Sequence, residues 1–172
     1  MMEHHHQQMM QDSQSETATP TMPGQDAFGA IQEIVRMLEA NPDTDWSKVN
    51  LEALRQHLID MNEVTLKAEA VARRVNDGIE VTVTGAGGRT AQAIQRMVPA
   101  HAQEIEHRHQ NFNGWSAKTE PLPDGVVLTV TSSDPQQVQR LRGLGFIGVM
   151  VSGSHHQPHH LGMAKGEFVH SQ

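Results

Sequence analysis

A repeated segment limits the folds available to this chain more than any other feature of its sequence. Residues 77–84, DGIEVTVT, match residues 124–131, DGVVLTVT, at a spacing of 47 residues and with five identities in eight positions. Each Asp-Gly dipeptide is a strong signal for a β-hairpin. In both copies a segment of helical periodicity follows the hairpin. The match indicates a duplicated ββα unit; two unrelated hairpins with the same turn chemistry are the alternative.

The duplicated unit predicts the architecture of the folded part. The expected strands are residues 66–75, 78–85, 114–122 and 125–132, and the expected helices run from about 90 to 107 and from Asp134-Pro135 onward. We therefore expect an α+β fold of two layers. In it, tandem ββα repeats (about 66–107 and 114–163) form a four-stranded, mostly antiparallel sheet with helices packed on one face.

Two amphipathic helices are expected before the repeat. Residues 27–40 place apolar side chains at helical spacing, and residues 50–61 repeat the pattern with Asn50 as the N-cap. We expect both helices to complete the two-layer fold, so that residues 27–172 form a single domain. Residues 1–26 have almost no branched apolar side chains, and this composition predicts a disordered tail.

The segment after the second hairpin has two possible structures. Residues 145–153, GFIGVMVSG, are rich in glycine and β-branched residues, which permits a strand. By the repeat, however, the same stretch aligns with the helix that carries Met97 and His101. We favour a long helix in which small residues pack closely on a neighbour, namely Gly143, Gly145, Gly148 and Ser152.

The charge balance restricts the kinds of partner. Asp and Glu number 20 against 13 Lys and Arg, and the formal net charge is −7. Nucleic acids and anionic membrane surfaces recruit basic patches, so neither is an expected partner. No apolar run approaches the 18 residues of a membrane span, so we expect no membrane insertion. A metal cation is the kind of ligand that an acidic chain tolerates best.

Histidine and methionine recur at helical spacing. The chain has 12 His, 10 Met and no Cys. Three pairs lie four residues apart: His57 with Met61, Met97 with His101, and His159 with Met163. Residues at this spacing lie on one face of a helix and can hold a metal ion together. Each pair also has a structural interpretation, because methionine often fills core gaps and a single histidine is often a hydrogen-bonded core residue.

Two histidine clusters add to this pattern. The segment SHHQPHHLGM holds four imidazoles within six residues, at His155, His156, His159 and His160, close to Met163. Such density has little packing rationale and indicates metal binding, with a solvated polar helix end as the alternative. The tail, MMEHHHQQMM, adds His4, His5 and His6. Tracts of this kind can capture ions without a preformed site; an appended, non-native sequence is the alternative.

The ligand types favour copper. Imidazole suits zinc, copper, nickel and iron, whereas thioether sulfur shifts the preference towards copper and above all Cu(I). Zinc sites ordinarily include carboxylate or thiolate beside histidine, yet no Asp or Glu lies within the 155–160 cluster. Zinc and nickel stay open as alternatives. In its tail composition and ligand types, the chain resembles the broad class of His/Met-rich periplasmic copper-binding and copper-resistance proteins.

These observations predict an extracytoplasmic copper-binding protein for copper resistance, sequestration or delivery, not an enzyme, with another copper-handling protein as a possible partner. His and Met ligands persist in an oxidising compartment where thiols form disulfides, so we expect a periplasmic location after removal of a signal peptide. One alternative is a metalloenzyme or haem-binding protein with His/Met ligation. Another is an interaction domain whose histidines act as a pH switch.

Overall fold

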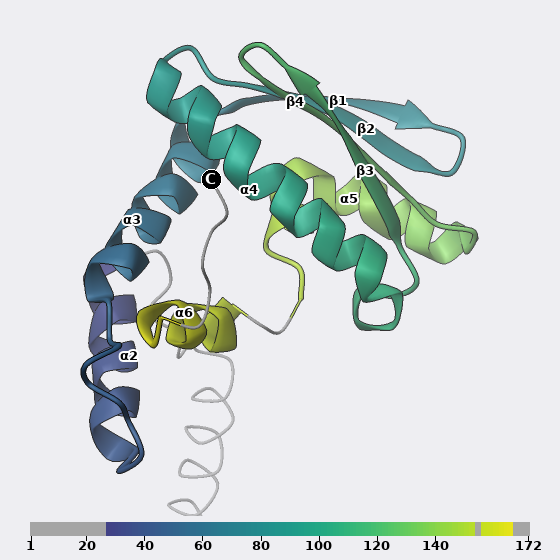
Figure 1. Ribbon diagram of the computed structural model, residues 1–172. Coiled ribbons are helices and arrows are strands. Elements are labelled where there is room, and N and C mark those ends of the chain that lie inside the picture. Colours follow the sequence, from purple (N-terminus) through teal and green to yellow (C-terminus); the bar gives the residue numbers. More distant parts are fainter. Residues whose placement is uncertain (1–26, 154–155, 167–172) are drawn as a thin grey trace, which may run out of the picture.

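The computed structural model describes residues 27–153 and 156–166, without the side chains of residues 156–159. Two helices come first, α2 (Ala27–Ala40) and α3 (Leu51–Asn62), and a short π-helix, η1 (Glu63–Lys67), continues α3. The first repeat follows as β1 (Glu69–Val75), β2 (Gly78–Thr84) and α4 (Gly88–His107). After the 3-10 turn η2 (His109–Phe112), the second repeat comprises β3 (Ser116–Leu122), β4 (Gly125–Thr131) and α5 (Pro135–Met150), and α6 (His156–Ala164) comes last (Figure 1).

The sheet confirms the predicted α+β class and the duplication. Its strand order is β1-β2-β4-β3, and every neighbouring pair is antiparallel. In the central pair Val81 lies opposite Leu128, which is the equivalent position in the other repeat. The two hairpins are therefore related by a pseudo-twofold axis at the middle of the sheet. The helices keep the same spacing, since α4 begins at Gly88 and α5 at Pro135.

The glycines of the two Asp-Gly turns are required by this symmetric packing. A Cβ atom at Gly78 would collide with the backbone oxygen of Val130, and one at Gly125 would collide with that of Val83. Val83 and Val130 are themselves equivalent positions of the repeat. Both turns need glycine because the second hairpin's backbone lies directly against the first.

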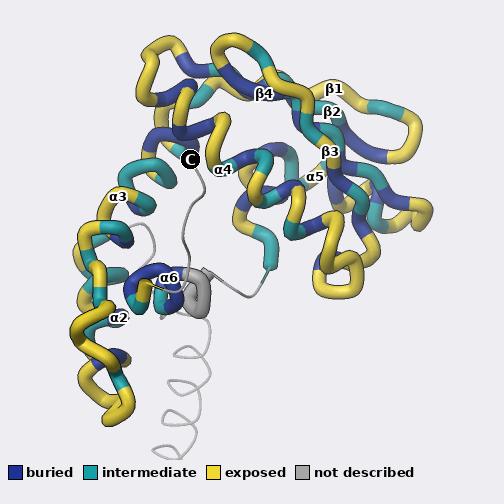
Figure 2. Tube along the Cα trace, viewed as in Figure 1, coloured by how far each residue is buried: buried dark blue, intermediate teal, exposed yellow. Residues whose placement is uncertain are grey.

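Helices α4 and α5 cover one face of the sheet and bury its alternate side chains. In β2 and β4 the buried valines, Ile79 and Leu128 point to this face, whereas the threonines, Glu80 and Val127 point to the other, as strand alternation requires. Helix α4 lies mainly over β3 and β4, whereas α5 lies over β2 and β1, so each helix covers the other repeat's hairpin. Figure 2 shows the resulting buried layer between sheet and helices.

The N-terminal helices form a second hydrophobic cluster. They do not join the helical layer that covers the sheet, which differs from the prediction that they complete the two-layer fold. This helical cluster consists of α2, α3 and α6, with Ile34, Leu38, Leu54, Leu58 and Ala164 at its centre. The apolar stripes of α2 and α3 face each other and α6, so no stripe is left for the sheet. Figure 1 shows these three helices beside the sheet and its helices.

The segment after the second hairpin is helical as far as Met150, as predicted, and is not a strand, but it does not form one long continuous helix. Within α5, Gly145 has φ 62° and ψ −162°, which is not a helical conformation and which glycine adopts readily. The helix ends at Met150, and α6 is a separate helix that begins at His156. Pro158 is the third residue of α6, in the first turn, where proline is tolerated. The predicted first strand also begins later than expected, because Leu66 and Lys67 belong to η1.

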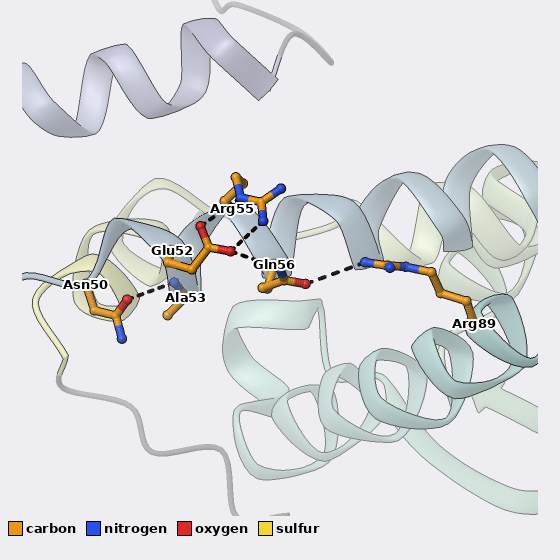
Figure 3. A network of polar contacts seen from close by, with 6 residues as sticks. All are labelled: Asn50, Glu52, Ala53, Arg55, Gln56 and Arg89. Atoms are coloured by element: carbon orange, nitrogen blue, oxygen red, sulfur yellow. Dashed lines mark hydrogen bonds and ion pairs between the residues drawn. The ribbon is translucent and has the colours of Figure 1, made fainter.

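Polar contacts join α3 to α4 and so connect the helical cluster to the hydrophobic core between the sheet and its helices. Figure 3 shows Asn50, whose side chain accepts a hydrogen bond from the Ala53 amide at 3.0 Å and caps α3, and Gln56, which lies 3.5 Å from Arg89. Farther along α3, Asp60 accepts two hydrogen bonds from the guanidinium of Arg96, at 2.9 and 3.1 Å.

At the end of this junction, Glu63 is a buried carboxylate. The Thr90 hydroxyl donates to it at 2.7 Å, and Lys67 donates to it at 2.9 Å. The hydrogen bond from Thr90, together with that from Lys67, holds the pKa of Glu63 below its usual value. Among the described residues, no helix combines the length and apolarity needed to cross a membrane.

Candidate metal centre

Two of the predicted ligands meet where α6 packs on α3. The imidazole rings of His57 and His160 have centroids 5.4 Å apart, with an interplanar angle of 68°. His160 is 5% exposed, and His57 is half-buried. His57 comes from the middle of α3, next to the buried Leu58. The structure therefore brings together two imidazoles that lie 103 positions apart in the sequence.

A second contact between α6 and α3 lies near the beginning of α3. The Asn50 amide donates to the Ala164 carbonyl at 2.7 Å, so the end of α6 lies at the beginning of α3. His160 lies beside His57 in the middle of α3. The two helices contact each other through these two regions, and α6 crosses α3 at an angle (Figure 1).

A methionine follows the histidine by one turn on each helix. Met61 lies four residues after His57, is half-buried and packs against the helical cluster. Met163 lies three residues after His160 and is 2% exposed. Residues at these spacings share a helix face. Each histidine of the pair therefore has a methionine about one turn away on its own helix.

The third predicted pair, Met97 with His101, lies in the hydrophobic core between the sheet and the helices α4 and α5. The Nε2 atom of His101 is 2.9 Å from the Val149 carbonyl oxygen, and its ring packs edge-on against Phe112 with centroids 5.6 Å apart. Met97 packs against the core between sheet and helices. His101 thus has the contacts of a structural histidine that fastens α4 to α5.

The remaining predicted ligands are described only in part. His156 and His159 belong to α6, but their side chains are not described; His155, His4, His5 and His6 lie outside the described residues. In the part of the chain that the structure describes, no three His, Asp or Glu side chains are arranged to hold a metal ion. Met61 and Met163 add thioether sulfur atoms on the same two helices.

The separation of the two rings fits a shared ion. With metal–nitrogen bonds of about 2.0 Å, two imidazoles on one tetrahedral ion have ring centroids roughly 5 Å apart, because each centroid lies about 1.1 Å beyond its nitrogen. The observed value is 5.4 Å. Burial of His160 also favours a bound ion, because it excludes competing water from one side of the site.

Comparisons of the chain with models of protein families, with curated proteins and with solved structures found no match. The argument for a function therefore rests on the residues of this chain and their geometry. The strongest element of that geometry is the His57–His160 pair between α3 and α6.

Proposed function

We propose that the protein binds a copper ion between α3 and α6 and serves in copper resistance, sequestration or delivery outside the cytoplasm. The observation that carries the proposal is the ring contact of His57 with the buried His160. Met61 and Met163 supply thioethers on the same two helices. Two imidazoles with a thioether form a ligand set that suits copper better than zinc, which ordinarily takes carboxylate or thiolate beside histidine.

The N-terminal tail has a supporting role in this proposal. His4, His5 and His6, with the neighbouring methionines, would capture ions and raise their local concentration near the folded site. The acidic net charge of −7 favours retention of a cation over binding of a polyanion. The absence of cysteine is compatible with the periplasm, where copper and oxidising conditions would otherwise oxidise thiols.

A copper titration of the full chain tests the site. Apo-protein is titrated with Cu(I) against a chromophoric competing chelator, and with Cu(II) by calorimetry. We expect His57→Ala and His160→Ala each to weaken the tightest copper site by more than about a hundredfold, because loss of a ligand exceeds the 10- to 100-fold cost of losing a residue that merely supports one. His107→Ala, which removes an exposed imidazole from α4, is the matched control and should leave the affinity unchanged.

Two further measurements separate the tail and the alternative ligands. Repeating the titration with His4, His5 and His6 replaced by alanine isolates the folded site, which should keep its affinity. An absorption spectrum of the purified protein distinguishes copper from haem, since an intense Soret band would identify haem. Tight binding of zinc or nickel with negligible copper binding would overturn the choice of metal, and equal copper affinity in the His57→Ala and His107→Ala variants would overturn the site.

A further inference from the structure

The two edge strands of the sheet are equivalent in the repeat. They differ in whether their outward-facing amide groups are free of blocking groups and can pair with another strand. Strands β1 and β3 are the edges. In each hairpin a two-residue turn joins strands whose closing residues pair directly, Val75 with Gly78 and Leu122 with Gly125. The alternation of antiparallel hydrogen bonds then directs the amides of Ala70, Ala72 and Arg74 in β1 outward. It does the same for Ala117, Thr119 and Pro121 in β3.

The β3 edge is blocked at two of its three outward positions. The Ala117 amide donates to the Glu106 carboxylate at 2.8 Å, so the last turns of α4 cap this edge. Pro121 has no amide hydrogen to donate. Such devices are common at the edges of natural sheets, because an open edge can pair with another chain.

The β1 edge lacks both devices. Its outward positions are two alanines and Arg74, with no proline, and the described residues place no capping group on their amides. The position equivalent to Glu106 in the second repeat is Gly153, beyond the end of α5 at Met150. Every residue of β1 from Glu69 to Arg74 is exposed, and Val71 is 69% exposed. A shorter second helix therefore leaves this edge open.

The sequence of β1 is complementary to itself in one antiparallel register. If two copies pair with Val71 opposite Val71, then Ala70 faces Ala72 of the partner subunit, which is a hydrogen-bonded pair of outward positions. On the same face as Val71, Glu69 then lies opposite the partner's Arg73. The segment Glu-Ala-Val-Ala-Arg thus combines a central apolar contact, small flanking residues and two opposite-charge pairs.

We propose that two copies of this chain associate through their β1 strands, antiparallel and centred on Val71, into one continuous sheet. A twofold axis perpendicular to the sheet generates this isologous contact. Arg73, whose guanidinium lies 2.7 Å from Glu80 in its own chain, then stands between Glu80 and the partner's Glu69. The charges select this register. A shift of one step in either direction breaks both charge pairs: in one direction Val71 lies opposite the partner's Arg73, and in the other direction Val71 lies opposite the partner's Glu69.

A single cysteine tests the register, because the chain has no cysteine of its own. In the proposed dimer the two Val71 residues form a non-hydrogen-bonded pair with Cα atoms about 4.5 Å apart, within the range that a disulfide spans. Val71→Cys should therefore cross-link into a covalent dimer under mild oxidation. Lys118→Cys, at the equivalent and also exposed position of β3, is the matched control. We expect it to cross-link at least about tenfold more slowly, since its thiols meet only by collision.

Two further pairs of variants test the backbone and the charges. Ala72→Pro removes an outward amide and should convert the dimer to monomer in sedimentation equilibrium over a concentration series. Thr119→Pro makes the same change on β3 and should leave association unchanged. Glu69→Lys should weaken association roughly tenfold at low salt, because the change acts at both symmetry-related pairs. Ser116→Lys, its equivalent on β3, should have no effect.

The outcomes separate clearly. Fast cross-linking of Val71→Cys with a concentration-dependent dimer of the parent chain supports the proposal. Equal cross-linking of Val71→Cys and Lys118→Cys, or a parent chain that stays monomeric throughout the concentration series, overturns it. Association that survives Ala72→Pro assigns the contact to another surface and equally overturns it.

Discussion

The helices α3 and α4 each carry a His/Met pair at the same spacing, and the fold uses the two pairs differently. On α4, the His101 ring is fixed by the Val149 carbonyl and by Phe112 within the main core. On α3, the His57 ring faces a second imidazole, His160, from α6. A ligand-like spacing therefore identifies a helix face that carries histidine. What that face packs against decides which groups surround the histidine, and therefore which role it can have.

Among the tests of this difference, replacement of His101 has the largest expected effect on stability. His101→Ala should destabilise the protein by about 3 kcal/mol, because it leaves the Val149 carbonyl without its ring partner and opens a cavity beside Phe112. Urea unfolding with a chelator present should show the full loss. The exposed His107→Ala variant should change stability by less than about 0.5 kcal/mol. If His101→Ala lost stability only when copper was present, the contrast between the two pairs would fail.

The next effect is stabilisation by copper. At a free copper concentration of 100 times the dissociation constant, one bound ion stabilises the folded state by about 2.7 kcal/mol. Thermal unfolding should show this gain in the parent chain and in His101→Leu, measured against the apo form of each. His160→Leu should lose it, since one imidazole of the pair is gone. A copper-induced shift of equal size in the His160 variant would place the ion elsewhere.

The smallest effect concerns the junction between the regions. The lowered pKa of Glu63 means that its contacts contribute stability above the pKa of the unfolded chain, and this contribution is lost as the pH falls through the folded pKa. Glu63→Gln should therefore reduce the acid dependence of unfolding. In a Trp46→Phe background, fluorescence reports Trp115 between the sheet and its helices, and circular dichroism reports all the helices together. The two signals should share one midpoint if the two clusters unfold together, and separate midpoints would show that they unfold independently.

Most of the sheet and its helices could be predicted from the sequence. The 47-residue repeat, the Asp-Gly turns and the capping residues Asn50 and Asp134 are local signals, and the structure confirms each of them. The C-terminal segment could not be predicted in this way. Its break depends on the positive φ of Gly145, and glycine permits that conformation without requiring it.

The candidate site was less predictable than the fold. Spacing along one helix singled out His57 and Met61 but carries no information about which helix will pack against them. The contact with His160 arises because α6 packs on α3, with Leu161 and Ala164 entering the helical cluster. Such tertiary packing is set by shape and apolar area over many residues. The open β1 edge was also invisible to sequence periodicity, because it depends on where α5 ends relative to α4.

Anomalous scattering at the copper absorption edge, from crystals of the copper-loaded full chain, tests the central claim most directly. The account predicts a copper peak between α3 and α6, with one ring nitrogen of His57 and one of His160 each about 2.0 Å from the ion and a methionine sulfur as a further ligand. A peak at His101, or copper bound only to residues of the N-terminal tail with none between His57 and His160, would contradict it.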